Sequence, residues 1–185
     1  GVLDMRIIAG KDKGRRLNRR DGQDVRPTSD RTKEALFSIL GSEVVGIRFL
    51  DLFAGFGGIG LEALSRGAYE SVFVDYKKSN IDIIEENIEM LGYEDKTKVI
   101  EADVLESLGL LRGDFDLIFM DPPYEKKELY EATLAEIEKY KLLHPTGIII
   151  IEHHSQVELD LGTEYDIIKK RDYGNAALTL IQRRE

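Results

Sequence analysis

The sequence contains no cysteine and no long uninterrupted run of apolar side chains. Without cysteine there is no disulfide framework, no thiolate metal site and no cysteine nucleophile, which favours a cytoplasmic protein. Because a membrane span needs about 20 apolar residues in a row, we expect no transmembrane helix. The first residues also lack the apolar core of a signal peptide.

The remaining composition is that of a folded domain. Hydrophobic residues make up 42% and charged residues 33% of the chain, which lies inside the globular range. A length of 185 residues suits one domain with a small appendage. We interpret Gly1 to Asp4, ahead of Met5, as a leader added for expression and exclude it from the fold.

Charge is distributed unevenly along the chain. The net charge is −9, yet residues 5–33 hold ten basic and four acidic residues, a net +6 that leaves −15 for the rest. A basic segment on an acidic body is the asymmetry expected when one face approaches phosphates. Since a solvated terminal segment has the same composition, charge alone leaves the partner open.

Apolar periodicity predicts an α/β fold. Short apolar runs alternate with amphipathic segments from residue 48 onward, which is typical of right-handed crossovers and of a mostly parallel, seven-stranded sheet with helices on both faces. The predicted elements are a small basic hairpin at 5–20, a helix ending before Gly41 and capped by Thr28, Ser29 or Asp30, strands at 49–53, 71–74, 99–100, 115–120 and 147–151, helices at 59–66, from the Ser79 cap to Gly92, at 104–111 and at 127–142, and a closing antiparallel hairpin from 165–169 and 177–181.

A glycine-rich turn follows the first predicted strand of the sheet. Residues 55–60 read GFGGIG, a G-x-G-x-x-G pattern between a strand and a helix. Glycine there lets bare backbone approach a ligand, and the helix offers unpaired N–H groups. Asp75 ends the next strand about 20 residues later, where a carboxylate accepts hydrogen bonds from ribose hydroxyls. The pattern therefore predicts a ligand that contains a nucleoside.

Two further acids distinguish among such ligands. Asp51, four residues before the turn, would repel a pyrophosphate but attract the ammonium of an amino acid, which favours S-adenosylmethionine. Asp103, at the end of the third strand, can accept from an adenine amino group while the Val104 N–H donates to a ring nitrogen. A dinucleotide-dependent oxidoreductase that uses the same glycine pattern is the alternative from another class.

A second motif, Asp121-Pro122-Pro123-Tyr124, follows the fourth predicted strand. Two consecutive prolines fix φ and keep the turn rigid. We expect the Asp121 side chain and the Pro122 carbonyl to accept both hydrogens of an exocyclic base amine, which frees the nitrogen lone pair for attack on a methyl group. Tyr124 would stack on an extruded base. These four letters alone fit an ordinary turn, and their place at a strand end beside the glycine turn favours catalysis.

Together with these two motifs, the segments RPTSDRTKEALFSIL (26–40) and YGNAAL (173–178) resemble the bacterial 16S rRNA (guanine(966)-N2)-methyltransferase family, often called RsmD. The resemblance covers nearly the whole chain from Met5. It implies a Rossmann-like class I methyltransferase with a basic hairpin arm at 5–25 and a catalytic domain at 26–185. The chain departs from the family at Asp75, where glutamate is more usual and reaches one methylene further, and at Ala176, where threonine is expected.

The candidate site residues fall into three groups. Residues expected at the cofactor are Asp51, Phe53, Ala54, Gly55, Gly57, Asp75, Asp103 and Val104. Catalytic candidates are Asp121, Pro122, Pro123 and Tyr124. Candidates for RNA contact are Lys13, Arg15, Arg16, Arg19, Arg26, Thr28 and Arg31, of which the resemblance places the last three at the methionyl end or the RNA entrance. We expect no metal, because His153 and His154 are adjacent on a strand and point to opposite faces.

The DPPY motif does not choose the substrate base, since it also serves adenine N6 and cytosine N4 on RNA or DNA. A DNA methyltransferase that reads sequence ordinarily carries an added recognition region, so the short basic arm favours a target recognised by the shape of a folded RNA. The resemblance implies the N2 amine of a guanine in 16S rRNA of the small ribosomal subunit. We expect a monomer. A non-catalytic RNA-binding protein on the same scaffold is a further alternative.

Overall fold

The computed structural model describes residues 5–19, 30–123 and 126–185. The leader at 1–4, Arg26, Thr28 and Tyr124 lie outside these ranges, as do the candidate cap Ser29 and the proposed arm boundary at residue 25.

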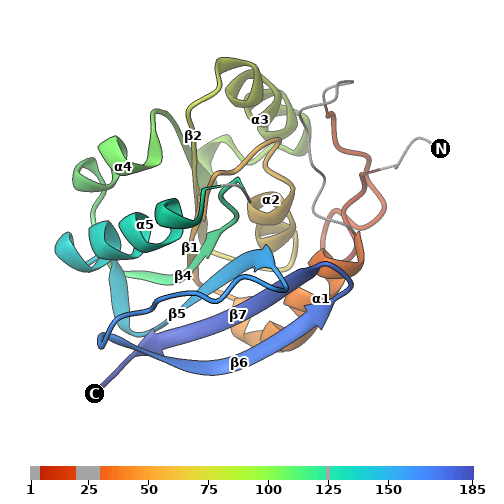
Figure 1. Ribbon diagram of the computed structural model, residues 1–185. Helices are drawn as coiled ribbons and strands as arrows, with labels where there is room; N and C mark the ends of the chain where they lie inside the picture. Colours follow the sequence, from red (N-terminus) through yellow and green to blue (C-terminus); the bar gives the residue numbers. More distant parts are fainter. Residues whose placement is uncertain (1–4, 20–29, 124–125) are drawn as a thin grey trace.

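Within the described residues, a seven-stranded sheet forms the centre of the molecule, in the order β3-β2-β1-β4-β5-β7-β6 (Figure 1). The five neighbouring strands β3, β2, β1, β4 and β5 are parallel to one another, while β7 is antiparallel to both of its neighbours, β5 and β6. The strands are β1 (Arg48–Leu52), β2 (Glu70–Asp75), β3 (Thr97–Glu101), β4 (Phe115–Met120), β5 (Leu143–His154), β6 (Tyr165–Tyr173) and β7 (Ala176–Arg183). The predicted Rossmann-like fold with its closing hairpin is confirmed.

Helices cover both faces of the sheet and enclose two apolar cores (Figure 1). One face carries α1 (Asp30–Leu40), α2 (Gly58–Ser65) and α3 (Lys78–Leu91); the other carries α4 (Val104–Ser107) and α5 (Lys127–Lys139). Short 3-10 helices are η1 (Gly41–Val44), η2 (Glu94–Lys96) and η3 (Leu108–Leu110). Successive strand residues alternate between the cores, so Phe49 belongs to the core on the side of α2 and Leu50 to the core on the side of α4. No described helix has the length and apolar character that crossing a membrane would require.

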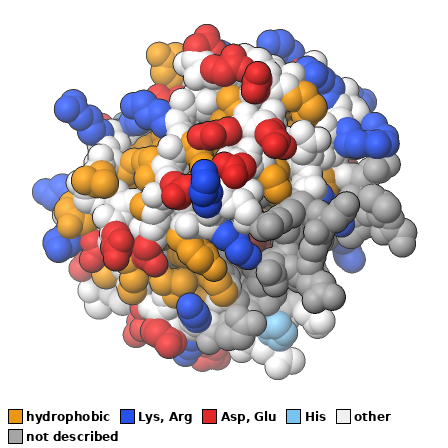
Figure 2. Space-filling view, turned by 90° about the horizontal axis from the view of Figure 1, so that it is seen from above, with side chains coloured by type: hydrophobic (Ala, Val, Ile, Leu, Met, Phe, Trp, Pro, Cys, Tyr) orange, Lys and Arg blue, Asp and Glu red, His pale blue; other side chains and the backbone are white. Residues whose placement is uncertain are grey.

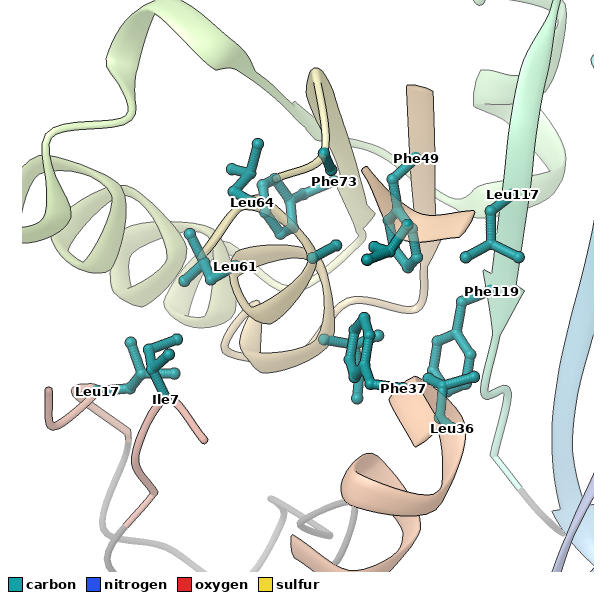
Figure 3. Close-up of a cluster of buried hydrophobic side chains, with 14 of the residues drawn as sticks. Ile7, Leu17, Leu36, Phe37, Phe49, Leu61, Leu64, Phe73, Leu117 and Phe119 are labelled. Carbon is teal, nitrogen blue, oxygen red and sulfur yellow. The ribbon is translucent and has the colours of Figure 1, made fainter. Parts of the chain in front are cut away.

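The basic hairpin is packed on the body of the domain. The Ile7 N–H donates to the Arg15 carbonyl over 2.9 Å, and the Leu17 N–H donates to the Met5 carbonyl over 2.7 Å. Ile7 and Leu17 are buried in the same core as Leu61 of α2 (Figure 3). Burial of these apolar side chains gives the segment a defined place on the domain.

A buried carboxylate on α2 holds this region together. Glu62 accepts hydrogen bonds from the backbone N–H groups of Ile8 (2.8 Å) and Ala9 (3.1 Å) and from the Arg66 guanidinium (2.8 Å). Its second cationic partner is Lys33 of α1, whose ammonium lies 3.1 Å from Glu62 Oε1. Both side chains are almost completely buried. Lys33, one of the ten basic residues counted in the segment 5–33, thus forms an internal ion pair.

Several predicted boundaries are wrong; among others, the helix predicted at 127–142 ends at Lys139, and the strand predicted at 165–169 continues to Tyr173. α3 begins at Lys78, and Ser79 lies in its first turn, because the Lys77 N–H is already held by the Asp75 carboxylate. The segment predicted as one helix at 104–111 is α4 followed by η3. β5 begins at Leu143 and continues to His154, since a shift of register beside Phe115 lets it pair earlier with β4.

We expect Glu62→Gln to lower the free energy of unfolding by about 3–5 kcal/mol, because the neutral amide leaves the buried Lys33 ammonium without its counter-charge. Urea denaturation at neutral pH measures the loss. The matched control is Asp82→Asn, which removes an ion pair with Lys78 whose side chains are 54% and 76% exposed; it should cost less than about 1 kcal/mol. Equal losses in the two variants would contradict the structural role of Glu62.

Candidate active site

The site lies where two adjacent parallel strands end. Leu52 at the end of β1 pairs in register with Met120 at the end of β4, so the glycine-rich turn and the Asp-Pro-Pro motif leave the sheet side by side. A cavity of about 550 Å³ is lined by residues of both segments. This is the position at which open parallel sheets bind ligands, because the strand order reverses between β1 and β4.

Several backbone features of the glycine-rich turn leave room for a ligand. Phe53 and Gly55 both adopt left-handed conformations, with φ of +60° and +61°. A Cβ added to Gly55 would meet no atom within 4 Å, so its exposed backbone faces open space in the cavity. For Phe53 this conformation costs on the order of 1–3 kcal/mol, as strained residues at binding sites often do.

The later glycines of the turn serve packing. A Cβ on Gly60 would lie 2.4 Å from a ring carbon of Phe73, so only glycine lets α2 approach β2 at this point. Gly57 precedes α2 with φ of +86° and is not among the residues that line the cavity. Of the predicted cofactor residues in the turn, Phe53, Ala54 and Gly55 line it.

Asp75 ties the turn to the end of β2. Its Oδ2 accepts a hydrogen bond from the Gly55 N–H over 2.9 Å, and its Oδ1 accepts from the Lys77 N–H (2.9 Å) and the Asn80 amide (3.2 Å). A carboxylate offers about four acceptor positions, so one is left for a ligand hydroxyl. Asp75 thus both shapes the turn and faces the cavity.

Asp51 is the most buried acid of the cavity. It lies on β1 with 2% of its surface exposed, and its Oδ2 accepts from the Gly60 N–H over 3.1 Å. Burial raises the pKa of the Asp51 carboxyl well above its ordinary value; the Gly60 N–H opposes this, and the negative charge of Asp75 adds to it. A cation placed beside Asp51 would favour the charged carboxylate and so lower this pKa.

Asp103 and Val104 lie at the third strand end. Asp103 caps α4, with its Oδ1 accepting from the Leu105 N–H over 2.9 Å. Val104 is the first residue of that helix, so its N–H has no partner inside the helix. Both residues line the cavity, as predicted from their position after β3.

The Asp-Pro-Pro motif forms the opposite wall. Asp121 and Pro123 line the cavity, and the Pro123 carbonyl accepts from the Lys126 N–H over 3.1 Å. Pro122 is buried and is not among the lining residues. Asp51, Asp75, Asp103 and Asp121 therefore border a single cavity, although they lie far apart along the chain.

Other residues that line this cavity were not predicted from the sequence, among them Met5, Lys33, Phe56, Tyr76, Lys77 and Asn80. Tyr76 and Lys77 could have been found, because they follow Asp75 directly at a strand end. Met5 and Lys33 gave no such signal, since the packing of the hairpin and α1 brings them there.

The predicted RNA-contact residues differ in exposure. Lys13, Arg15, Arg16 and Arg31 are exposed, whereas Arg19 is half-buried. Arg15 donates to the Met90 carbonyl of α3 over 3.0 Å and lies 3.5 Å from the Asp12 carboxylate, so part of its hydrogen-bonding capacity holds the hairpin in place. On the face seen in Figure 2, acidic side chains gather near the middle and most Lys and Arg side chains lie nearer the outline.

The described residues contain no group of three or more acidic, His or Cys side chains placed to hold a metal ion. His153 is a buried residue of β5. Its Nε2 lies 2.7 Å from Oγ1 of Thr179 on β7, and its Nδ1 lies 2.8 Å from the His154 carbonyl oxygen. Burial lowers the pKa of His153, so the ring is neutral at physiological pH.

Comparisons with known proteins agree with this geometry. The family described as conserved hypothetical protein 95 matches residues 5–182. The chain is 37% identical to the Bacillus subtilis protein named "Putative rRNA methyltransferase YlbH", over 97% of this chain and 100% of that one. It is 31% identical to ribosomal RNA small subunit methyltransferase D of Escherichia coli K12, over 99% and 92%. The solved structure of yhhF from Escherichia coli superposes with a TM-score of 0.88, at 28% identity, over 97% and 98% of the two chains.

The buried Asp51 predicts an unusual dependence of stability on pH. Since its pKa is higher in the folded than in the unfolded chain, the folded state holds the extra proton, and the free energy of unfolding falls as the pH rises from the unfolded pKa towards the folded one. Asp51→Asn should remove this loss while keeping an oxygen to accept from Gly60. We therefore expect the ligand-free variant to have a higher melting temperature than the wild type near neutral pH, with a gap that closes towards about pH 4.

Differential scanning fluorimetry in a buffer series measures both melting curves. Asp166→Asn, at an exposed ion pair with Arg184, controls for the general effect of removing one negative charge. A gap between Asp51→Asn and the wild type that does not change with pH would show that Asp51 is not held in the environment described.

Proposed function

The chain belongs to the conserved hypothetical protein 95 family, and we propose that it transfers a methyl group from S-adenosylmethionine to the N2 amine of a guanine in 16S ribosomal RNA. It is an RsmD-like, S-adenosylmethionine-dependent rRNA methyltransferase. The choice of guanine N2 and of the small subunit is the part proposed. The single cavity bordered by both the glycine-rich turn and the Asp-Pro-Pro motif is the observation that carries methyl transfer to an amine. The proposed small subunit is supported by the similarity to small subunit methyltransferase D, and the proposed guanine N2 rests on the family resemblance described above.

The residues of the cavity fit S-adenosylmethionine. Asp51 offers a negative charge to the ammonium of its amino-acid part, and Asp75 offers an acceptor to the ribose hydroxyls. Asp103 and the Val104 N–H offer an acceptor and a donor to the adenine edge. The open space over Gly55 admits the ligand against bare backbone. When bound, the cofactor supplies an electrophilic methyl group on a sulfonium.

The opposite wall suits the acceptor amine. An amine conjugated with a base ring is a weak nucleophile, because its lone pair is delocalised. We propose that the Asp121 carboxylate and the Pro122 carbonyl each accept one hydrogen of this amine and so hold its lone pair towards the methyl donor. Tyr124, outside the described residues, is proposed to stack on the extruded base. Pro122 and Pro123 keep this wall rigid.

The proposed partner is 16S rRNA, free or in an assembling small subunit, bound by a monomer in the cytoplasm. The exposed cations of the hairpin support this proposal, since they give the acidic chain a positively charged surface for phosphates. Because the hairpin is packed on the body and also contributes Met5 to the cavity, phosphates bound there would lie close to the site.

Nucleoside mass spectrometry tests the reaction. Unmodified 16S rRNA and small subunits are incubated separately with the protein and S-adenosylmethionine and digested to nucleosides. We expect N2-methylguanosine from at least one substrate. N6-methyladenosine or N4-methylcytidine would overturn the proposed base, and no product from either substrate would overturn the proposed RNA.

Asp121→Ala serves as the matched control in the same assay. We expect it to lower the rate of transfer by about 10²–10³-fold, because the amine loses one of its acceptors. The dissociation constant for S-adenosylhomocysteine, measured by calorimetry, should change by less than about threefold, since Asp121 is not one of the proposed cofactor contacts. Wild-type activity in this variant would contradict amine binding by Asp121.

Binding of 16S rRNA should weaken steeply with salt. If about five cations of the basic segment contact phosphates, log K falls with log salt with a slope of roughly −3 to −5. Lys13→Ala should reduce the magnitude of the slope by about 0.7–0.9, since Lys13 is an exposed hairpin cation. Lys139→Ala, at the end of α5, is the control and should leave the slope unchanged. Equal slopes for the wild type and Lys13→Ala would remove Lys13 from the RNA interface.

A further inference from the structure

One polar side chain interrupts the apolar face of α3. Asn87 lies among the buried residues Ile84, Ile88 and Leu91 of this helix and is completely buried. A buried amide without partners would cost stability, so its hydrogen bonds show what it does at this position. They lead to two segments that are far apart in the sequence.

The first partner is the backbone of Asn18, in the second arm of the hairpin, whose arms are joined by one isolated bridge between Arg6 and Arg16. The Asn18 N–H donates to Asn87 Oδ1 over 2.7 Å, and Asn87 Nδ2 donates back to the Asn18 carbonyl over 2.9 Å. The side-chain amide therefore pairs with one residue's backbone as a neighbouring strand would. The side chain of Asn18 takes no part in this pairing.

The second partner is the glycine-rich turn. Asn87 Nδ2 also donates to the Phe56 carbonyl over 3.1 Å. Phe56 lies between Gly55 and Gly57, and it lines the cavity. The turn is closed on itself by the Gly57 N–H, which donates to the Ala54 carbonyl over 2.9 Å. Holding the Phe56 carbonyl therefore helps to fix the backbone against which the cofactor is expected to lie.

Other contacts of α3 and of Tyr93, which follows it, hold the hairpin but do not reach the turn. Arg15 donates to the Met90 carbonyl, and the Tyr93 hydroxyl donates to Asp12. Lys11 lies over the ring of Tyr93, with its ammonium 5.5 Å from the ring centre. These contacts would keep the hairpin docked after a change at Asn87, so the link to the turn can be tested without detaching the hairpin.

We propose that Asn87 is a positioning residue that joins the basic hairpin to the glycine-rich turn, so that the cofactor and the RNA bind with coupled affinities. A cofactor that orders the turn orders the Phe56 carbonyl, the Asn87 amide and the Asn18 backbone with it. Phosphates bound by the hairpin act on the turn through the same bonds, since coupling between two sites is reciprocal. The binding of RNA at the hairpin and the identity of that RNA rest on the proposed function.

Hydrogen exchange with and without S-adenosylhomocysteine tests the link. In the wild type we expect the ligand to slow exchange of the turn at 54–57 and, through Asn87, of the Asn18 amide. In Asn87→Ala the turn should still respond, while the hairpin response is lost. The dissociation constant for S-adenosylhomocysteine should rise by about 3- to 10-fold, because the turn loses a hydrogen bond that orders it.

Asn18→Ala is the matched control, because the pairing uses only the backbone of Asn18. It should retain the wild-type exchange response and cofactor affinity. If Asn87→Ala does not fold, Asn87→Asp replaces it; the carboxylate still accepts from the Asn18 N–H but no longer donates to the carbonyls of Phe56 and Asn18. The same loss of hairpin response is then expected. Circular dichroism and melting temperature establish that each variant is folded.

Two results would overturn the proposal. One is a hairpin whose exchange is unaffected by ligand in the wild type, or still affected in a folded Asn87 variant. The other is an Asn87 variant with a lower melting temperature but an unchanged dissociation constant for S-adenosylhomocysteine, because a purely structural role of Asn87 would give this result.

In the Asn87 variants, the KM for 16S rRNA should rise with the loss of coupling. Failure of the wild type to methylate 16S rRNA would overturn the proposed substrate alone, because ligand-dependent exchange needs no RNA.

Discussion

The parallel pairing of β1 with β4 is the contact on which the site depends. It places the turn after Leu52 beside the turn after Met120, so a ligand held by one turn lies next to groups carried by the other. Strand order reverses at this point, which opens a crevice that neighbouring crossovers do not fill. Every proposed chemical role uses a residue that lies in the last two positions of a strand ending at this edge or follows such a strand.

The electrostatics of the cavity follow from the same arrangement. Acids at successive strand ends are brought together, and burial makes the innermost one, Asp51, resist ionisation. The Gly60 N–H, which donates to Asp51, offsets part of this cost, while the Gly55 N–H donates to the neighbouring Asp75. A site of this kind favours a ligand that carries positive charge into it, and S-adenosylmethionine has both an ammonium and a sulfonium. The acidic cavity thus suits the cationic cofactor, and the basic hairpin suits the phosphates of the proposed RNA.

Much of the fold could be predicted from the sequence, because periodicity and turn residues are local. The alternation of strands and helices predicted the mostly parallel sheet, and the β4 bounds are those predicted. Prediction failed where a distant or neighbouring group changes a boundary. Ser79 is a good cap by type, yet the Asp75 carboxylate holds the Lys77 N–H and α3 begins before it.

The sequence by itself determined which chemical groups stand at the strand ends, since Asp51, Asp75, Asp103 and Asp121 each follow from a local motif. Tertiary structure alone decided which polar groups are buried. Lys33 belongs to a basic segment but pairs with Glu62 on another helix, and Asn87 binds a backbone 69 residues away. Burial and pairing depend on contacts between segments distant along the chain, and a local pattern carries no information about those contacts.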